Sequence, residues 1–183
     1  MLDFYLHQYN SNLGIITSLA SPHLYRTPAI KMLSRQSECL TAWERDKIKI
    51  AEKFISRLLE VYGKDESFLL FTPASMNRMF VDTIIDHIKH EFLNVIDMTS
   101  IFRKKENVSF GESKFDNYSV AQLADFIEVM NSPLETVPEN LNKAFIVDDV
   151  FSTGKSIEVT KYLILQTFGK DCEIKSGVIV KTT

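Results

Sequence analysis

Residues 145–156, FIVDDVFSTGKS, bring together residue types that can bind a phosphorylated ligand. The last three letters, GKS at 154–156, match the end of the ATP-binding P-loop GxxxxGK[ST]. The first glycine of that motif would stand at position 149, where this chain has Asp149, and a carboxylate there would repel a triphosphate. The stretch is therefore not a P-loop, and its two adjacent acids, Asp148 and Asp149, need another explanation.

The segment that follows the two acids suits a single phosphate. A short loop that leads into a helix offers backbone N–H groups, and the helix N-terminus adds the positive end of its dipole. Gly154 would let a phosphate approach the backbone closely. The hydroxyl groups that can add hydrogen bonds belong to Ser152, Thr153 and Ser156.

The paired acids suit the other end of such a ligand. Asp148 and Asp149 come at the end of a predicted strand, a few residues before the loop, so we expect them to flank the same ligand. Carboxylates there suit sugar hydroxyls or a magnesium ion. A ligand with a phosphate at one end and a diol at the other is a ribose 5-phosphate. The alternative interpretation is that the two acids are only a solvated strand end.

The elements that must position these residues follow from hydrophobic spacing and apolar runs. The 3.6-residue period and helix-stop signals predict helices over residues 41–62, 76–92, 119–130 and 155–168. Short apolar runs predict strands over residues 67–72, 93–98, 143–147 and 174–181. Residues 99–117 are polar and predict a long loop. Strands that alternate with helices indicate a parallel sheet, whose ligands bind at the carboxyl ends of the strands.

We therefore expect an α/β fold with a central, mainly parallel sheet flanked by helices. The core would span residues 41–183, and residues 1–40, which show no clear period, would form an N-terminal cap or hood. The length of 183 residues permits one domain with a real core. The formal net charge of −3 argues weakly against non-specific binding of nucleic acid, although a local basic patch stays possible.

Several site classes and locations are excluded by composition. Cys39 and Cys172 form no CxxC motif, so they indicate neither a disulfide scaffold nor a zinc site. His87 and His90 are spaced i, i+3, and no third metal ligand accompanies them. The N-terminus lacks the features of a signal peptide, and no apolar run reaches the roughly 18–20 residues that span a bilayer. We expect a cytoplasmic protein that does not bind membranes.

The hydrophobic run, the two acids and STGKS together resemble the phosphoribosyl-diphosphate (PRPP) signature of type I phosphoribosyltransferases. Residues 147–183 are also similar to the corresponding part of hypoxanthine-guanine phosphoribosyltransferases, including the final VIVKTT. The resemblance implies the α/β fold of that family and a PRPP ligand with Mg²⁺. It implies transfer of the phosphoribosyl group to a base or other acceptor, release of pyrophosphate, and a homodimer.

The resemblance also implies roles for individual residues. Asp148 and Asp149 would hold the ribose hydroxyls, directly or through Mg²⁺, and residues 152–156, including Lys155, would hold the 5-phosphate. The segment after strand 67–72 would meet the diphosphate through the amides of Ala74 and Ser75 and through Arg78, and Lys181 would contact the base. The basic run at 103–105 would belong to a mobile catalytic loop. The catalytic residues that follow from the resemblance are Asp148, Asp149, Ser152, Arg103 and Lys104.

Three departures from the family pattern support a second hypothesis. Ser152 stands where the purine enzymes have an aspartate that acts as general base, and the segment TPASMNR at 72–78 has no glycine. The base-stacking segment of the purine enzymes would follow residue 183. The chain could therefore be a regulator or effector that binds PRPP and acts with a protein or nucleic-acid partner. The basic run at 103–105 could likewise be only a solvated charge run.

Overall fold

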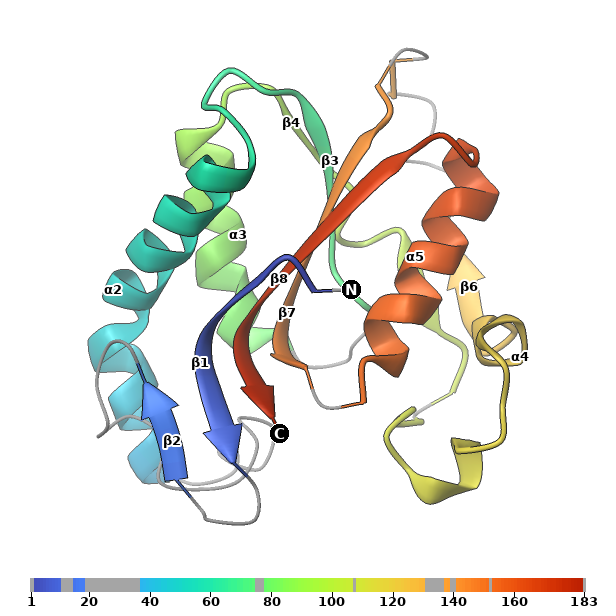
Figure 1. The fold of residues 1–183 in the computed structure, drawn as a ribbon, viewed down its shortest axis with the longest axis horizontal. Helices are drawn as coiled ribbons and strands as arrows, with labels where there is room; N and C mark the ends of the chain where they lie inside the picture. Colours follow the sequence, from blue (N-terminus) through green and yellow to red (C-terminus); the bar gives the residue numbers. More distant parts are fainter. Residues whose placement is uncertain are drawn as a thin grey trace.

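The chain folds around one central sheet (Figure 1). The computed structural model describes residues 2–10, 15–18, 37–74, 78–106, 108–130, 137–138, 141–151 and 153–182. Within them a six-stranded sheet has the order β2-β1-β8-β7-β3-β4, and only β2 runs antiparallel to its neighbour. The strands are β1 Phe4–Asn10, β2 Ile15–Ser18, β3 Phe68–Phe71, β4 Val95–Asp97, β7 Lys143–Phe151 and β8 Glu173–Thr182. The predicted α/β class with a mainly parallel sheet is confirmed.

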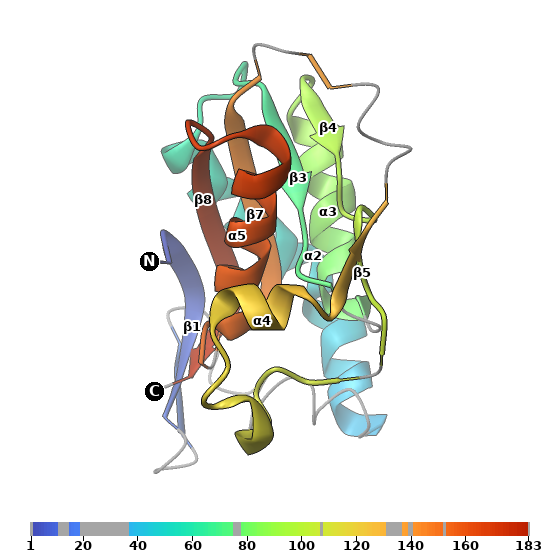
Figure 2. The same cartoon turned by 90° about the vertical axis from the view of Figure 1, so that its right-hand side faces the viewer.

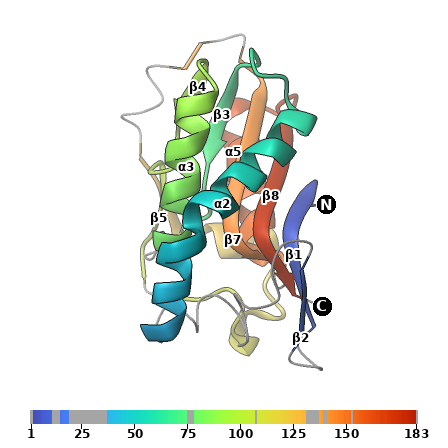
Figure 3. The ribbon, with the colours of Figure 1, turned by 90° about the vertical axis from the view of Figure 1, so that its left-hand side faces the viewer.

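Helices cover both faces of this sheet. Helices α2 (Ser37–Val61) and α3 (Met79–Glu91) lie on one face, as Figure 3 shows. Helix α5 (Lys155–Phe168) lies on the other. Beside α5 is a small unit that we call the insertion, residues 99–130 (Figure 2). It contains β5 Phe102–Lys104, η1 Ser113–Phe115, α4 Val120–Ala124 and β6 Ile127–Val129.

Strand β7 supplies side chains to both layers because successive residues of a strand point to opposite faces. Phe145 and Val147 belong to the core under α2 and α3. Ala144 and Ile146 belong to the core under α5 and the insertion. All four residues are buried, so β7 is covered on both sides, as is typical of a central parallel strand.

The core under α2 and α3 is aromatic. The ring centroid of Phe54 lies 4.8 Å from that of Phe4 and 6.2 Å from that of Phe145. Gly177 of β8 makes this packing possible, because a Cβ atom there would come within 2.6 Å of the Phe4 ring. The hydroxyl of buried Tyr62 donates a hydrogen bond of 3.1 Å to the Ala144 carbonyl oxygen. Burial of that hydroxyl raises the pKa of Tyr62, and nearby acids add to the effect.

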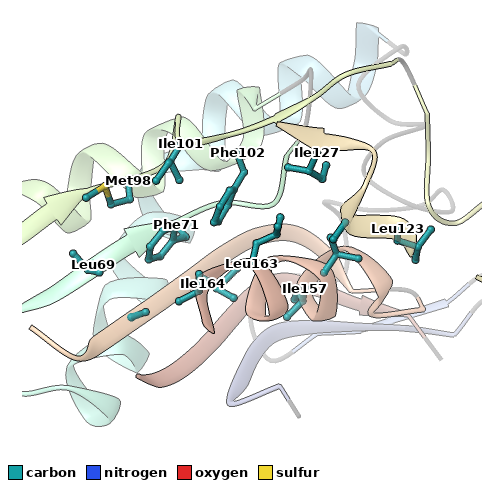
Figure 4. Packing of buried hydrophobic residues seen from close by; sticks show 14 of the residues in the cluster. Leu69, Phe71, Met98, Ile101, Phe102, Leu123, Ile127, Ile157, Leu163 and Ile164 are labelled. Atoms are coloured by element: carbon teal, nitrogen blue, oxygen red, sulfur yellow. The ribbon is translucent and has the colours of Figure 1, made fainter. Parts of the chain in front are cut away.

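The second core joins α5 and the insertion to the sheet (Figure 4). Ile157, Leu163 and Ile164 of α5 belong to the same core as Phe71 of β3, and the Phe71 ring stacks on Phe102 with centroids 5.7 Å apart. The insertion therefore packs on the sheet through its apolar side chains and is part of the folded body.

The structure corrects two predictions about local elements. The predicted loop over 99–117 contains β5 and η1, and the helix predicted to reach residue 130 ends at Ala124. The capping box of Ser119 and Gln122 that starts this helix is confirmed. Residues after Asp125 form β6 because they pair with β5, a partner that lies about 25 residues earlier in the chain.

The N-terminal region was predicted to be irregular, and that is wrong at residues 4–10 and 15–18. These residues form β1 and β2, and β1 pairs in parallel with β8 inside the central sheet. Residues 19–36 lie outside the described residues, so the cap over residues 1–40 stays a prediction. In the part of the chain that the structure describes, no helix is long and apolar enough to cross a membrane. The cytoplasmic location also stays a prediction.

Candidate functional site

The two acids lie inside β7. Their side chains are buried, with 7% of Asp148 and 6% of Asp149 exposed. The strand was predicted to end at Val147, but β7 continues through both acids to Phe151, because its register with β8 is maintained to Lys181. The acids are therefore held by the sheet itself, close to its carboxyl edge.

The alternation of β7 separates the two carboxylates. Asp148 is on the same face of the sheet as Ile146, the face covered by α5. Asp149 is on the same face as Val147, the face covered by α2 and α3. The backbone N–H of Asp149 donates a hydrogen bond of 2.9 Å to Oδ1 of Asp148. A ligand that contacts both carboxylates has to reach around the carboxyl end of β7.

The predicted phosphate loop leads directly from β7 into α5. Ser152 lies outside the described residues. Gly154 is the N-cap of α5 and has φ 77° and ψ −7°, a left-handed conformation that favours glycine. A glycine cap has no side chain, so it cannot accept hydrogen bonds from the first-turn amides as the side chain of Ser or Asp would. The hydroxyl of Thr153 accepts one long hydrogen bond, 3.4 Å, from the Lys155 amide. This helix end can bind one anion.

Lys155 opens α5, and its side chain contacts the insertion. Its ammonium donates to Oδ1 of Asp116 at 2.8 Å and to the carbonyl oxygen of Phe115 at 3.2 Å. Ser156, the next residue, lines a small cavity of about 10 Å³ together with Ala74 and Phe102. The structure thus brings Ala74, predicted in the pyrophosphate loop, next to Ser156 of the phosphate loop. Ser75 lies outside the described residues.

Arg78 is engaged with the segment that follows β4. Its guanidinium donates to the carbonyl oxygen of Thr99 at 3.1 Å and to the Thr99 hydroxyl at 2.8 Å. Its Nε also lies 3.3 Å from Oδ1 of Asp82. The guanidinium therefore ties the start of α3 to the carboxyl end of β4.

Asp97 extends this network and was not singled out in the sequence. Its Oδ1 accepts hydrogen bonds from the Thr99 amide at 3.0 Å and the Thr99 hydroxyl at 2.6 Å, and its Oδ2 accepts one from Lys89 at 2.8 Å. Burial works to raise the pKa of Asp97, but the hydrogen bonds from Lys89 and Thr99 outweigh it and hold the pKa below its ordinary value. The signal that could have found this residue is its place at the end of a predicted strand.

Arg103 and Lys104, two of the three basic residues predicted for a mobile loop, lie on β5. Arg103 is exposed and pairs with Glu128 of β6 in the strand register. The Lys104 ammonium donates a 2.6 Å hydrogen bond to the Val108 carbonyl oxygen and lies 5.0 Å from the centre of the Phe110 ring. Both residues are therefore part of a paired strand in this structure.

Lys181 is on the other side of β7, near the end of β8. Its ammonium lies 5.4 Å from the centre of the Tyr5 ring of β1. The lysine predicted to contact a base is thus at the same edge of the sheet as the two acids.

The buried acids allow a limited role for a metal ion. Within the described residues, no group of three or more His, Cys, Asp or Glu side chains gathers around one point. Mg²⁺ is often bound through one or two carboxylates, with substrate phosphates and waters as its other ligands. Because β7 separates Asp148 from Asp149, the residues fit an ion that takes one of these carboxylates and draws its remaining ligands from the substrate and water.

A larger cavity lies at the opposite end of the sheet. It has a volume of about 570 Å³ and is formed at the amino ends of β3, β4 and β7. Its lining includes Leu93, Ile96 and the ion pair of Lys143 with Glu66. None of the residues predicted to bind PRPP lines this cavity.

The chain resembles at least one protein of known structure. The structure is similar to that of a hypoxanthine phosphoribosyltransferase from Staphylococcus aureus, with 16% sequence identity and a TM-score of 0.45. The similarity covers 76% of this chain and 74% of that chain. No protein-family model and no curated protein matches the sequence. A likeness at this level decides neither the fold nor the function of the chain.

Proposed function

We propose that the chain binds PRPP with Mg²⁺ and transfers its phosphoribosyl group to a base or other acceptor, releasing pyrophosphate. The observation that carries the proposal is the pair of buried acids on β7, followed within a few residues by the glycine cap of α5. A phosphate at the start of α5 and a diol at Asp148 or Asp149 would together account for both features. The two ends of the proposed ligand, a phosphate and a diol, thus correspond to the two parts of the site.

The reaction needs a site that favours charge separation. As pyrophosphate leaves C1 of the ribose, the ring becomes positive and the leaving group gains negative charge. Asp148 and Asp149 would orient the sugar through its hydroxyls, and α5 would fix its 5-phosphate. Bound Mg²⁺ would neutralise charge on the diphosphate. The amide of Ala74 and the guanidinium of Arg78 lie after β3, where they would stabilise the leaving group.

A second candidate function is a PRPP-binding regulator or effector without transfer activity, acting with a protein or nucleic-acid partner. The contacts of Arg78 favour it, because Thr99 and Asp82 already engage the guanidinium that would meet the leaving group. Lys104 is likewise engaged with Val108. Ser152 is also a poor general base, so the acceptor would have to be one that needs no strong base.

Thermal unfolding with PRPP and Mg²⁺ tests the pocket. A ligand at about 100 times its Kd stabilises the folded state by about 2.7 kcal/mol. For a chain of this size, that corresponds to a rise in Tm of roughly 5–10 °C. Asp148→Asn and Asp149→Asn should each remove most of this rise. Glu66→Gln is the matched control, because it neutralises a carboxylate in the cavity at the opposite end of the sheet.

The outcomes separate the hypotheses. A wild-type Tm unchanged by PRPP and Mg²⁺ would rule out the proposed pocket. Loss of the rise in Glu66→Gln with retention in both Asp variants would move the site to the cavity at the amino ends. Stabilisation accompanied by pyrophosphate release in the presence of a panel of bases supports the transferase. Stabilisation with no release from any base supports the regulator.

A further inference from the structure

The contact between Lys155 and the insertion joins two parts of the molecule that are far apart in sequence. Lys155 is the first residue of α5, and Phe115 and Asp116 precede it by 40 and 39 residues. Only 21% of the Lys155 side chain is exposed, against 63% for Asp116. The ammonium is therefore held against the insertion and does not extend freely into solvent.

The segment that Lys155 holds is the aromatic centre of the insertion. Phe115 is 3% exposed, and its ring centroid lies 5.9 Å from that of Phe110, 5.3 Å from that of Tyr118 and 5.5 Å from that of Phe126. The next helix, α4, packs on α5 in Figure 2. A shift of the Phe115 carbonyl would thus disturb this aromatic group.

The ammonium retains a hydrogen for a ligand. A lysine ammonium has three hydrogens, and Phe115 and Asp116 accept two of them. The described residues supply no third acceptor. The side chain starts directly after Gly154, so the ammonium is no further than one lysine side chain from the amides that open α5. Because a largely buried ammonium without acceptors is costly, Lys155 should keep both protein contacts when a phosphate binds.

We infer that Lys155 is a positioning residue that couples the segment 113–118 of the insertion to phosphate binding at α5. Two of its hydrogens fix the segment, and the third reaches the phosphate. This inference rests on the proposed function, since it requires a phosphate at the start of α5. Coupling of this kind is reciprocal: the bound phosphate steadies the segment, and the fixed segment strengthens phosphate binding.

The variant Asp116→Ala tests the inference, because a charge effect and a positioning effect predict opposite changes in phosphate affinity. A carboxylate near an anion site repels the anion, so removing it should strengthen phosphate binding if Asp116 acts only through its charge. If Asp116 acts by positioning Lys155, the same change should weaken binding, by about two- to fivefold for a partly exposed ion pair. Titration of ribose 5-phosphate, followed by calorimetry, distinguishes the two results.

Hydrogen exchange provides the second readout. In the wild type, ribose 5-phosphate should slow amide exchange in peptides that cover residues 110–126. Asp116→Ala should bind the ligand and lose most of this protection. Lys155→Met should lose the protection and bind more weakly, and the double variant should bind no more weakly than Lys155→Met alone. Lys170→Met, which removes an exposed lysine beyond the far end of α5, should behave like the wild type.

The following results would overturn the inference. Tighter binding by Asp116→Ala, or full ligand-induced protection in it, would show that the contact with Lys155 is not coupled to phosphate binding. Additive losses in the double variant would show the same. If the wild type binds neither ribose 5-phosphate nor PRPP, the proposed function fails and the inference with it. If it binds normally and only the coupling is absent, the inference alone fails.

Discussion

The two ends of the central sheet differ in what they provide for ligand binding: one has the larger cavity, and the other has the charged and polar groups. The amino ends of β3, β4 and β7 enclose the larger space, about 570 Å³, which is within the usual size range of ligand pockets. The carboxyl ends carry the buried acids and the glycine cap of α5. Cavity volume and site chemistry thus favour opposite ends. We favour the carboxyl ends as the ligand site, because burying carboxylates costs free energy of desolvation and forming an ordinary surface hollow does not.

The largest effects are expected at the two glycines with positive φ that lie at the ends of α5, one at each end. Gly154, with φ 77°, opens the helix at the carboxyl edge, and Gly169, with φ 101°, ends it at the opposite side. Replacement by Ala should lower the free energy of unfolding by about 1–3 kcal/mol in each case, because both backbones disfavour a Cβ. Chemical denaturation measures this loss.

The ligand response should distinguish the two variants. Gly154→Ala should also lose the Tm rise caused by PRPP and Mg²⁺, since the new methyl group obstructs the approach of a phosphate. Gly169→Ala should keep that rise, because no atom lies within 4 Å of the point that its new methyl group would occupy and the residue is remote from the acids. Equal losses of the ligand response in both variants would contradict the assignment of the phosphate to α5.

A smaller effect is expected for Tyr62, which supports the start of β7. Tyr62→Phe removes the hydrogen bond to Ala144 and should cost about 0.5–1.5 kcal/mol. The burial that raises the pKa of Tyr62 means that the folded protein keeps the hydroxyl protonated above the ordinary value of 10.0. This contribution to stability is complete below that value and is lost as the pH rises above it.

Thermal unfolding between about pH 9 and about pH 11 checks this prediction. The wild type should lose stability more steeply than Tyr62→Phe across that range. PRPP binding should be equal in both proteins, because Tyr62 contacts the amino half of β7. Parallel pH profiles would show that the hydroxyl is not protected in the folded protein.

The smallest effect is expected for Asp97. Because its folded pKa is lowered, its contribution to stability is present above the unfolded pKa, ordinarily 3.8, and is lost as the pH falls below it. Asp97→Asn should therefore reduce stability near neutral pH, by less than about 1 kcal/mol for this partly exposed group. The difference from wild type should vanish in acid. A difference that persists unchanged below about pH 3 would assign the effect to packing.

The sequence predicted the sheet and its helices because hydrophobic spacing reports local structure well. The strand that carries the acids, helix α5 and the final strand were all expected, and the structure has them as β7, α5 and β8. The acids were placed at a strand end because charged residues seldom continue a buried strand. Their pairing with β8 keeps them in it, and no local pattern reveals that pairing.

Long-range contacts account for the other differences. β6 forms because it meets β5, and β1 joins the sheet because it meets β8. Arg78 was expected to face a diphosphate, and its hydrogen bonds to Thr99 depend on how β3 and β4 align.

The parallel pairing of β1 with β8 has a consequence for the order of folding. Phe4 is opposite Gly177, and the Ser176 amide donates to Asp3 across 173 positions of sequence. During synthesis β1 emerges before the other described strands, yet its parallel neighbour in the sheet is made after all of them. Apart from β2, the described residues offer it no earlier strand partner. Non-local pairing of this kind slows folding and leaves strand edges exposed meanwhile. The nascent chain should therefore complete its sheet only after β8 has left the ribosome.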